Sequence, residues 1–292
     1  MEEEDFDHVG VWTEVKLDII SRYAEKYAKI LDAQRKRGTT FKFYYIDACA
    51  GKGKHISKTS GQAIQGSPLN ALKIDPPFSR YYFIDLDPET CENLRILKEE
   101  ENRRLGQAGK PIREVEIINE DCNRVLPEKI LPEIRYSDYK RALCFLDPYN
   151  LGIDWEVLHL AGRLKTIDIF LNFSIMDANM NILFHNKEAA SPEQKERLNR
   201  VWGDNSWEEL AYSVNPDLFG HLDILKQPNT VIARAFADRL RKVAGFKYVP
   251  TPIPMRNSQN SPVYYLFFAS QNSAANDIAS YIFRKYGKRL MN

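Results

Sequence analysis

The chain has 292 residues, with 41 Lys and Arg against 40 Asp and Glu, which gives a formal net charge of +1. This length allows one large domain or two small ones, and a hydrophobic fraction of 43% is enough for a sizeable core. The near-zero net charge argues against a protein that holds nucleic acid by general electrostatic attraction, although it leaves room for a local basic patch.

Other features of the composition indicate the cellular compartment. No run approaches about 18 consecutive apolar residues, so we expect no membrane span and no membrane partner. Residues 1–5 are acidic, the opposite of a signal peptide. The cysteines are scattered without a CxxC pair, which favours reduced thiols over disulfides or a zinc site: Cys49, Cys91, Cys122 and Cys144. We therefore expect a cytoplasmic protein without a metal site.

The first part of the chain alternates between helical and strand patterns. Apolar residues recur at helical spacing over 12–36, and this helix is expected to end at Gly38. Short aromatic and β-branched runs then alternate with helices, which predicts a parallel sheet with helices on both faces. The expected strands are 41–46, 81–84, 114–118, 142–146 and 167–171, and the expected helices between them are 67–74, 88–105, 127–134 and 155–164.

Residues 175–228 break this rhythm, and polar helices expected at 191–202 and 207–212 make this segment a helical insertion. Regularity returns with a helix over 230–244, an edge or irregular strand over 246–254, a strand over 263–268 and a helix over 278–286. The prediction is an α/β fold with a seven-stranded, mostly parallel sheet in one domain, 1–292, in which 1–40 is an N-terminal helical extension.

The polar and glycine residues of interest all fall at the carboxyl ends of the expected parallel strands, where such sheets bind ligands. They are Asp47, Gly51, Gly53, Asp85, Asp121, Asp147 and Asn172. Glycine lets a backbone turn tightly and approach a ligand closely. Ile56 replaces the third glycine of the dinucleotide fingerprint, and the spacing does not match a phosphate-binding P-loop either. The loop Ala50-Gly51-Lys52-Gly53 instead favours a nucleoside with a short charged tail, or is a plain strand-to-helix turn.

Two further carboxylates suit parts of a nucleoside. Asp85 can accept two charge-assisted hydrogen bonds from ribose hydroxyls. Its alternative role is to cap the helix after Pro88, which Asp87 fits better. Asp121 can accept a hydrogen bond from an adenine amino group, with Cys122 donating its backbone N–H. The alternative for Asp121 is again a helix cap.

Asp147-Pro148-Tyr149 is the most reactive element of the sequence. The Asp147 carboxylate and the Pro148 carbonyl can accept hydrogen bonds from a planar amine while the Tyr149 ring stacks on its face. This arrangement would align the nitrogen for in-line attack, so catalysis would come mainly from positioning. A turn with an aspartate cap is the alternative. Cys49, Cys122 and Cys144 can converge near this site, but buried structural cysteines are more common than catalytic thiols.

The order of these motifs resembles class I S-adenosylmethionine-dependent methyltransferases. Residues 47–53 resemble the first motif, Asp85 the ribose-binding acid, residues 121–122 the adenine-binding turn and residues 147–149 the fourth motif. The resemblance implies a Rossmann-like sheet and S-adenosylmethionine as cofactor. It further implies a catalytic set of Asp147, Pro148 and Tyr149, and a cofactor-binding set of Asp47, Ala50, Gly51, Gly53, Asp85, Asp121 and Cys122.

Nearly the whole chain also resembles the three-Cys-motif partner protein family. The matching segments are Trp12-Thr13-Glu14-Val15-Lys16-Leu17, residues 47–53, Gly66-Ser67-Pro68-Leu69-Asn70-Ala71-Leu72 and Phe145-Leu146-Asp147-Pro148-Tyr149. In that family the three cysteines belong to the partner, a protein similar to radical S-adenosylmethionine proteins. The resemblance therefore implies a cofactor-binding fold and a cysteine-rich partner, without a defined substrate.

Two features depart from the methyltransferase pattern. The segment Lys54–Gly66 separates the glycine loop from the next helix and is long enough to fold over a cofactor or reach a substrate. The fourth motif has one proline, whereas enzymes that methylate nucleic-acid amines usually have two. Our leading hypothesis is a methyltransferase acting on an amine, with a nucleic-acid base as first candidate. The alternatives are a cofactor-binding module for the cysteine-rich partner and, less favoured, an NAD-dependent oxidoreductase.

Overall fold

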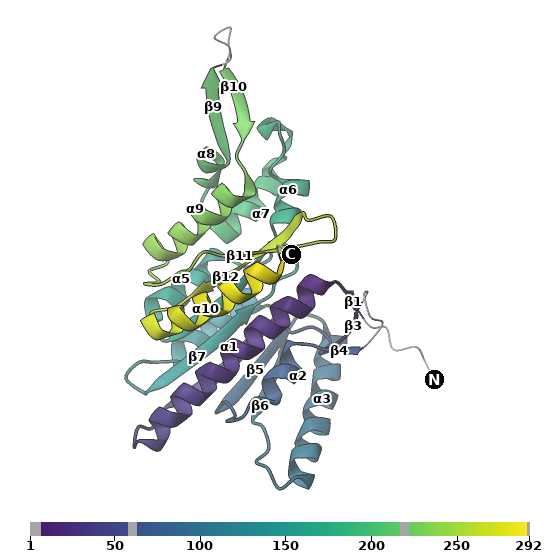
Figure 1. Cartoon of the computed structure of the whole chain (residues 1–292), viewed down its shortest axis with the longest axis vertical. Coiled ribbons are helices and arrows are strands. Elements are labelled where there is room, and N and C mark those ends of the chain that lie inside the picture. The colour runs from purple at the N-terminus through teal and green to yellow at the C-terminus, as the bar shows by residue number, and fades with distance from the viewer. Residues whose placement is uncertain (1–6, 58–62, 217–221, 291–292) are drawn as a thin grey trace.

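The computed structural model describes residues 7–57, 63–216 and 222–290, and its centre is a seven-stranded sheet in the order β11-β12-β8-β7-β2-β5-β6 (Figure 1). Strands β2, β5, β6, β7 and β8 run parallel, whereas β12 is antiparallel to both of its neighbours. The predicted Rossmann-like α/β fold is confirmed. The strands are β2 (Lys42–Ala48), β5 (Arg80–Asp85), β6 (Val115–Asn119), β7 (Lys140–Leu146), β8 (Ile167–Phe173), β11 (Ile253–Arg256) and β12 (Pro262–Ala269).

Helices cover both faces of this sheet, as the alternating pattern predicts. Strand β7 shows why: Leu143 and Phe145 belong to one buried cluster, and Cys144 and Leu146 belong to the other, because successive side chains point to opposite faces. The first cluster lies under α1 (Val11–Lys36), α2 (Ser67–Leu72), α3 (Pro88–Gln107) and α10 (Ser273–Leu290). The second lies under α5 (Trp155–Leu164), α7 (Pro192–Trp202) and α9 (Asn229–Lys242).

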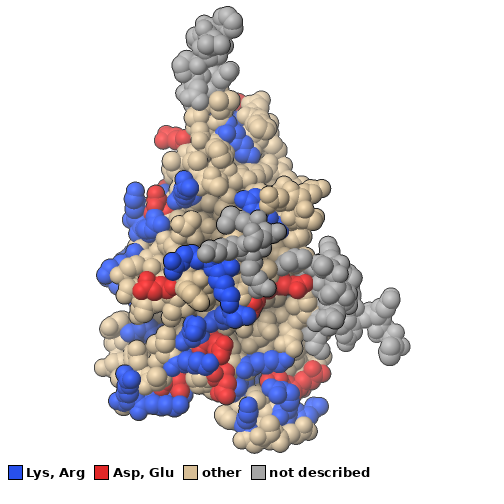
Figure 2. Space-filling model, viewed as in Figure 1, with Lys and Arg blue, Asp and Glu red and all other residues tan. Residues whose placement is uncertain are grey.

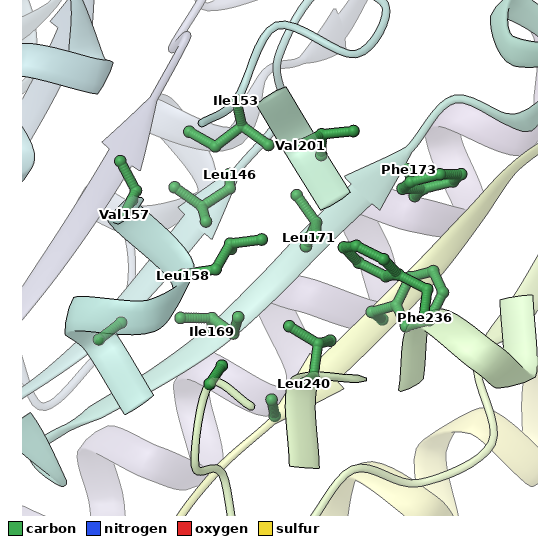
Figure 3. Packing of buried hydrophobic residues seen from close by; sticks show 14 of the residues in the cluster. Leu146, Ile153, Val157, Leu158, Ile169, Leu171, Phe173, Val201, Phe236 and Leu240 are labelled. Carbon is green, nitrogen blue, oxygen red and sulfur yellow. The ribbon is translucent and has the colours of Figure 1, made fainter. Parts of the chain in front are cut away.

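The core under α5 and α9 shows the packing most clearly. Leu146, Ile169 and Leu171 project from the sheet toward Leu158 of α5 and Leu240 of α9 (Figure 3). All of these side chains are 1% exposed or less, so aliphatic groups from the sheet and from both helices fill the space between them.

Residues 175–228 form an insertion that is not purely helical, which corrects the sequence-based expectation. It contains helices, as expected, and then a two-stranded antiparallel ribbon that projects from the body of the molecule (Figure 1). The sequence does not indicate a strand here, because both faces of a narrow ribbon stay partly exposed and apolar and polar residues need not alternate. Apolar side chains occupy the neighbouring positions 224 and 225. The elements are α6 (Ile175–Asn181), η3 (Lys187–Ala189), α7, α8 (Trp207–Ala211), β9 (Tyr212–Pro216) and β10 (Leu222–Lys226).

The long segment after the glycine loop begins and ends at one point. The Gly66 N–H donates to the Gly53 carbonyl at 2.8 Å, and a Cβ on Gly66 would lie 2.9 Å from the Gly53 backbone. Between them, β3 (Lys54–Ser57) and β4 (Ala63–Gln65) pair antiparallel, and β1 (Asp7–Val9) joins β3. Two strands of a small three-stranded sheet therefore lie in the segment expected as a loop. Residues 58–62 of that segment lie outside the described ranges.

Two other boundaries differ from expectation. The strand expected over 246–254 is confined to β11, and residues 246–249 contribute only a bridge between Tyr248 and Ser270. The helix expected over 127–134 begins earlier and changes pitch, as α4 (Cys122–Val125), η1 (Leu126–Ile130) and η2 (Leu131–Glu133). Within the described ranges, no helix combines the length and apolar character needed to cross a membrane.

Phe236 of α9 gives a direct test of this core. Its ring is fully buried and lies 4.8 Å from the Phe173 ring and 5.3 Å from the Trp202 ring, centroid to centroid. Phe236→Ala should lower the free energy of unfolding by about 3–5 kcal/mol in urea titrations, because it removes buried surface and leaves a cavity. The control, Tyr281→Ala on an exposed site of α10, should change it by less than about 0.5 kcal/mol. Equal effects would contradict the packing.

Candidate functional site

The carboxyl ends of β2 and β7 meet at the point where the strand order reverses. From β2 the chain builds outward through β5 and β6, then returns to place β7 and β8 on the other side of β2. Open α/β sheets bind ligands at such a switch point. The Asp147 N–H donates to the Ala48 carbonyl at 3.2 Å, which holds the two strand ends together. Since side chains alternate, Asp47 and Asp147 both emerge on the face covered by α1.

Asp47 is a buried carboxyl group whose hydrogen-bonding capacity is not used. It is 0% exposed, and neither oxygen has a hydrogen-bond partner among the described residues. Burial raises its pKa well above the usual range, and the nearby Ser67 hydroxyl opposes that rise without reaching hydrogen-bond geometry. Among charged neighbours, Asp147 raises the pKa and Lys16 lowers it. A buried acid of this kind is typical of a binding site rather than of a structural core.

Asp147 is held from two sides. The Lys16 ammonium donates to its Oδ2 at 2.5 Å, and the Asn172 amide donates to its Oδ1 at 2.8 Å. The Lys16 side chain is 7% exposed and that of Asp147 25%. Lys16 also lies over the rings of Phe145 and Tyr264, at 5.7 and 5.3 Å from their centroids. The first helix therefore supplies the cation of the site.

Lys16 is the functional residue that the sequence reasoning missed. It appears above only within the segment 12–17 of the family resemblance, with no role assigned to it. Its spacing to Ile19, Ile20 and Tyr23 places it on the buried face, since residues three, four and seven apart share one side of a helix. A lysine on an apolar stripe was the available signal.

The glycine loop is tied to Asp85. Gly51 has φ +65°, a conformation that favours glycine, and its N–H donates to Asp85 Oδ2 at 3.0 Å. Asp85 Oδ1 accepts from the Asp87 N–H at 3.0 Å. Asp87 itself caps α3, so the capping role that the sequence assigned to it is the one it has. Each Asp85 oxygen keeps a second acceptor site, so the group remains able to accept ribose hydroxyls.

The turn after β6 has the structural role that was weighed as the alternative for Asp121. Asp121 caps α4, because its Oδ1 accepts from the Asn123 N–H at 2.9 Å. Asn123, which the sequence analysis did not single out, donates to the Gly152 carbonyl at 3.0 Å and accepts from the Asp154 N–H at 2.8 Å. These bonds connect the turn at Asp121 to the loop that follows Tyr149.

Two of the cysteines do come together. Cys49 Sγ lies 3.9 Å from Cys122 Sγ, linking the glycine loop to the turn after β6. The hydrogen bond to Cys122, followed by burial, raises the pKa of Cys49, and burial raises that of Cys144. Thiols with raised pKa values are poor nucleophiles at neutral pH, so these side chains contribute shape rather than reactivity.

The rim of the site carries an exposed aromatic ring and an exposed aliphatic side chain. Pro148 is buried, whereas Tyr149 is 88% exposed and Leu86, next to Asp85, is 68% exposed. Among the described residues, no group donates a hydrogen bond to the Pro148 carbonyl. The predicted residues are therefore placed at the carboxyl ends of four adjacent strands: Asp47 near the end of β2 and Ala50, Gly51 and Gly53 after it, Asp85 as the last residue of β5, Asp121 and Cys122 after β6, and Asp147, Pro148 and Tyr149 after β7.

The charges at this edge favour a cationic ligand. Asp85, Asp147 and Lys16 are the charged groups that act on Asp47, so three carboxyl groups face one ammonium. A cation placed near Asp47 would lower its pKa and supply the missing hydrogen bonds. In the part of the chain that the structure describes, no three His, Cys, Asp or Glu side chains form a group able to hold a metal ion.

Comparisons with known proteins add little to this geometry. No protein-family model and no curated protein matches the chain. Among solved structures, the chain is similar to protein LPL1258 from Legionella pneumophila str. Philadelphia 1, a DUF519 protein. The similarity covers 77% of this chain and 88% of that one, with 13% identity and a TM-score of 0.37. At that score it carries no argument about function.

Because the pKa of Asp47 is raised, its carboxyl group should lower the free energy of unfolding as the pH rises. Its pKa is higher in the folded state than the usual value near 3.9, so stability falls as pH rises above about 4 and stays low beyond the folded pKa. The Asp47→Asn variant lacks this ionisation. Its stability relative to the native protein should therefore increase between about pH 4 and pH 7, by at least about 1.4 kcal/mol, the equivalent of one pKa unit.

Urea unfolding at both pH values measures this difference. Asp277→Asn, an exposed site on α10, should show no such trend. If the stability of Asp47→Asn relative to the native protein stays constant or decreases as the pH rises, the pKa of Asp47 is not raised in the folded state.

The Lys16–Asp147 pair should be sensitive to loss of one partner. Lys16→Met leaves a partly buried carboxylate uncompensated and should cost about 3 kcal/mol of unfolding free energy. The double variant Lys16→Met, Asp147→Asn should recover part of that loss in a double-mutant cycle. Lys29→Met breaks an exposed ion pair with Glu25 on the same helix and should cost about 0.5 kcal/mol or less. Strictly additive single effects would contradict the coupling.

Proposed function

We propose that the protein is an S-adenosylmethionine-dependent methyltransferase that acts on an amine. The observation that carries this proposal is the buried Asp47 carboxyl group with two unpartnered oxygens beside Asp147. That excess of carboxyl groups suits a ligand with a sulfonium and an ammonium group. It is unfavourable for a dinucleotide, whose pyrophosphate would meet Asp47 and Asp147 at the same edge, so an NAD-dependent oxidoreductase is disfavoured on charge as well as on sequence.

The residues present fit this cofactor. Asp47 would accept hydrogen bonds from the ammonium group of the amino-acid part. Gly51, with open space where a Cβ would lie, leaves room for close approach of that part to the glycine loop. Asp85 would accept the ribose hydroxyls, and the exposed Leu86 would lie against the adenine ring. Asp121 and the Cys122 N–H would recognise the adenine edge.

Bound in this way, the cofactor supplies an electrophilic methyl group, and the chain itself has to orient the acceptor. Asp147 has one remaining acceptor site on each oxygen beside its bonds to Lys16 and Asn172. Together with the Pro148 carbonyl it can hold the two N–H groups of a planar amine, while the Tyr149 ring stacks on its face. Holding the nitrogen in line is the main catalytic contribution.

A nucleic-acid base is the acceptor that this geometry favours, because it combines a planar ring with an exocyclic amine. The basic residues that could contact a nucleic-acid backbone are gathered in one region of the surface. Figure 2 shows a run of Lys and Arg side chains across the centre of the face that carries α1 and α10, bordered by acidic ones. Arg284 and Lys285 of α10 are exposed, and the side chains of Lys288 and Arg289 lie outside the described residues.

One observation favours the second function, a cofactor-binding partner for a cysteine-rich radical S-adenosylmethionine-like protein. The Lys16 ammonium already occupies one side of Asp147, where a substrate amine would bind. A protein that binds the cofactor and docks to a partner, without transferring the methyl group, needs no free acceptor at this place.

Cofactor binding can be tested by thermal unfolding. S-adenosylhomocysteine or S-adenosylmethionine at about 100 times its dissociation constant adds about 2.7 kcal/mol and should raise the melting temperature by roughly 5–10 °C. Asp47→Asn and Asp85→Asn should reduce that shift, and Asp277→Asn should retain it. NAD should give no shift. The cofactor assignment fails if neither sulfur ligand stabilises the native protein.

Methyl transfer separates the two functions. With labelled S-adenosylmethionine, the protein should label cellular RNA or DNA, and Asp147→Asn should slow transfer by about 100-fold or more through misplacement of the amine. Asp138→Asn, an exposed carboxylate at the other end of the sheet, is the control. Transfer at the native rate by Asp147→Asn would refute its role. Stabilisation by the cofactor without any transfer, together with co-purification of a cysteine-rich partner, would support the second function.

A further inference from the structure

A second cleft lies at the opposite edge of the sheet, between α1 and α10 at the amino ends of β7 and β8. Its volume is about 550 Å³, comparable to sites that hold small molecules. Arg141, the second residue of β7, lines this cleft, and Asp147 directly follows the other end of the strand. Six residues of extended chain separate these positions by about 20 Å, so the cleft is distinct from the site proposed for the cofactor.

The walls of this cleft are aromatic. Tyr27 of α1, Phe41, Tyr136 and Tyr248 all line it. Burial raises the pKa of Tyr27 well above its usual range, so its hydroxyl is a neutral donor, and it has no hydrogen-bond partner among the described residues. Rings on several sides of one cleft present flat surfaces on which a planar ligand can stack.

The cleft also carries three cations without a salt-bridge partner in the described part of the chain, and the charge of one of them, Arg141, acts on the Asp168 carboxyl group of the lining and lowers its pKa. Arg141, Lys165 and Lys247 line it, and none of them forms an ion pair within the described ranges. The Arg141 guanidinium lies 4.2 Å from the Tyr136 ring centroid and gives one hydrogen bond to the Lys140 carbonyl, which leaves several N–H donors. The Lys247 ammonium lies 5.4 Å from the Tyr248 ring centroid.

The carboxyl group in the lining is already engaged on the core side. Asp168 is half-buried, and its oxygens accept hydrogen bonds from the Tyr23 hydroxyl at 2.8 Å and from the Ser270 hydroxyl. Three cations and five aromatic rings, Tyr23 included, therefore line a space whose carboxyl group, Asp168, accepts hydrogen bonds from two hydroxyl groups.

A neighbouring cleft on the same edge of the sheet provides a contrast. Four cations line it, and three of them are paired: Arg35 with Asp32, Arg80 with Glu114 and Lys140 with Asp138. The fourth, Lys42, has no ion pair among the described residues. Arg80 also stacks on the Tyr82 ring, at 5.9 Å from the centroid. A stacked cation is thus not unusual on this surface, whereas a group of unpaired cations around one cleft distinguishes the site at Arg141.

We propose that this cleft binds a small planar aromatic anion. The ring would stack between the aromatic walls, and the anionic group would bind Arg141 and Lys247. Guanidinium groups held against a ring are suited to this task, because they are pre-oriented and offer paired donors to a carboxylate or phosphate. An aromatic carboxylate and an aryl or nucleoside phosphate share this chemistry.

Isothermal titration calorimetry can test the site with defined probes. Benzoate, phenyl phosphate and adenosine monophosphate represent the two anionic groups and a nucleotide, and phenol and inorganic phosphate represent the separate parts. We expect at least one ring-bearing anion to bind one to one, at least about ten-fold more tightly than either part alone. Preference for benzoate or for the phosphates identifies which anionic group the site takes. Binding should persist with S-adenosylhomocysteine present, since the two sites are separate.

Variants locate that binding. Arg141→Gln and Lys247→Gln should each weaken it about ten-fold or more, through loss of a charge-assisted bond, whereas the matched variant Arg80→Gln should leave it unchanged. Lys247 is tested alongside Arg141 because the Arg141 variant also removes a contact with Tyr136. The proposal is overturned if no ring-bearing anion binds below roughly 10 mM. It is also overturned if S-adenosylhomocysteine displaces the probe, or if both variants bind like the native protein.

Discussion

The parallel pairing of β2 with β7 is the constraint on which the candidate site depends. Its register places Asp47 opposite Phe145 and Ala48 opposite Leu146, and Asp147 directly follows the end of β7. Side chains alternate, so both acids emerge on the α1 face, where two nearby carboxyl groups repel each other. A slip of one residue would turn one of them into the opposite core. Lys16 supplies the compensating charge, so the helix that precedes the sheet is part of the site.

The same arrangement gives the two acids at this edge of the sheet different surroundings. A stable core would pair or remove a buried carboxyl group, yet Asp47 keeps two oxygens without partners. Asp147, in contrast, receives a lysine and an asparagine and is fixed in direction. In the proposed function, Asp147 is the acid that orients a group and Asp47 is the acid that receives one. Such a division of roles between neighbouring acids costs stability and is characteristic of functional sites.

Helix α1 connects the two edges of the sheet. Lys16 near its start reaches the carboxyl edge, and Tyr27 in its second half lines the cleft at the amino edge. Eleven residues of helix span about 16 Å, close to the length of the strands beneath. The two edges differ in character: acids and glycines gather at one, and arginine, lysine and tyrosine at the other. A chain with a net charge of +1 can in this way present sites of opposite sign.

The sequence alone determined the order of the strands and helices, the α/β class and the set of residues at the strand ends. These follow from local patterns, since apolar periodicity and turn residues are properties of neighbouring positions. It did not identify the β9–β10 ribbon, the small sheet around β3, the pairing of Lys16 with Asp147 or the cleft at Arg141. Lys16 and Asp147 lie 131 positions apart, and the residues of the cleft come from both ends of the chain. Only tertiary structure decides which distant charges meet and which are left unpaired, because burial and register act between segments that no local pattern connects.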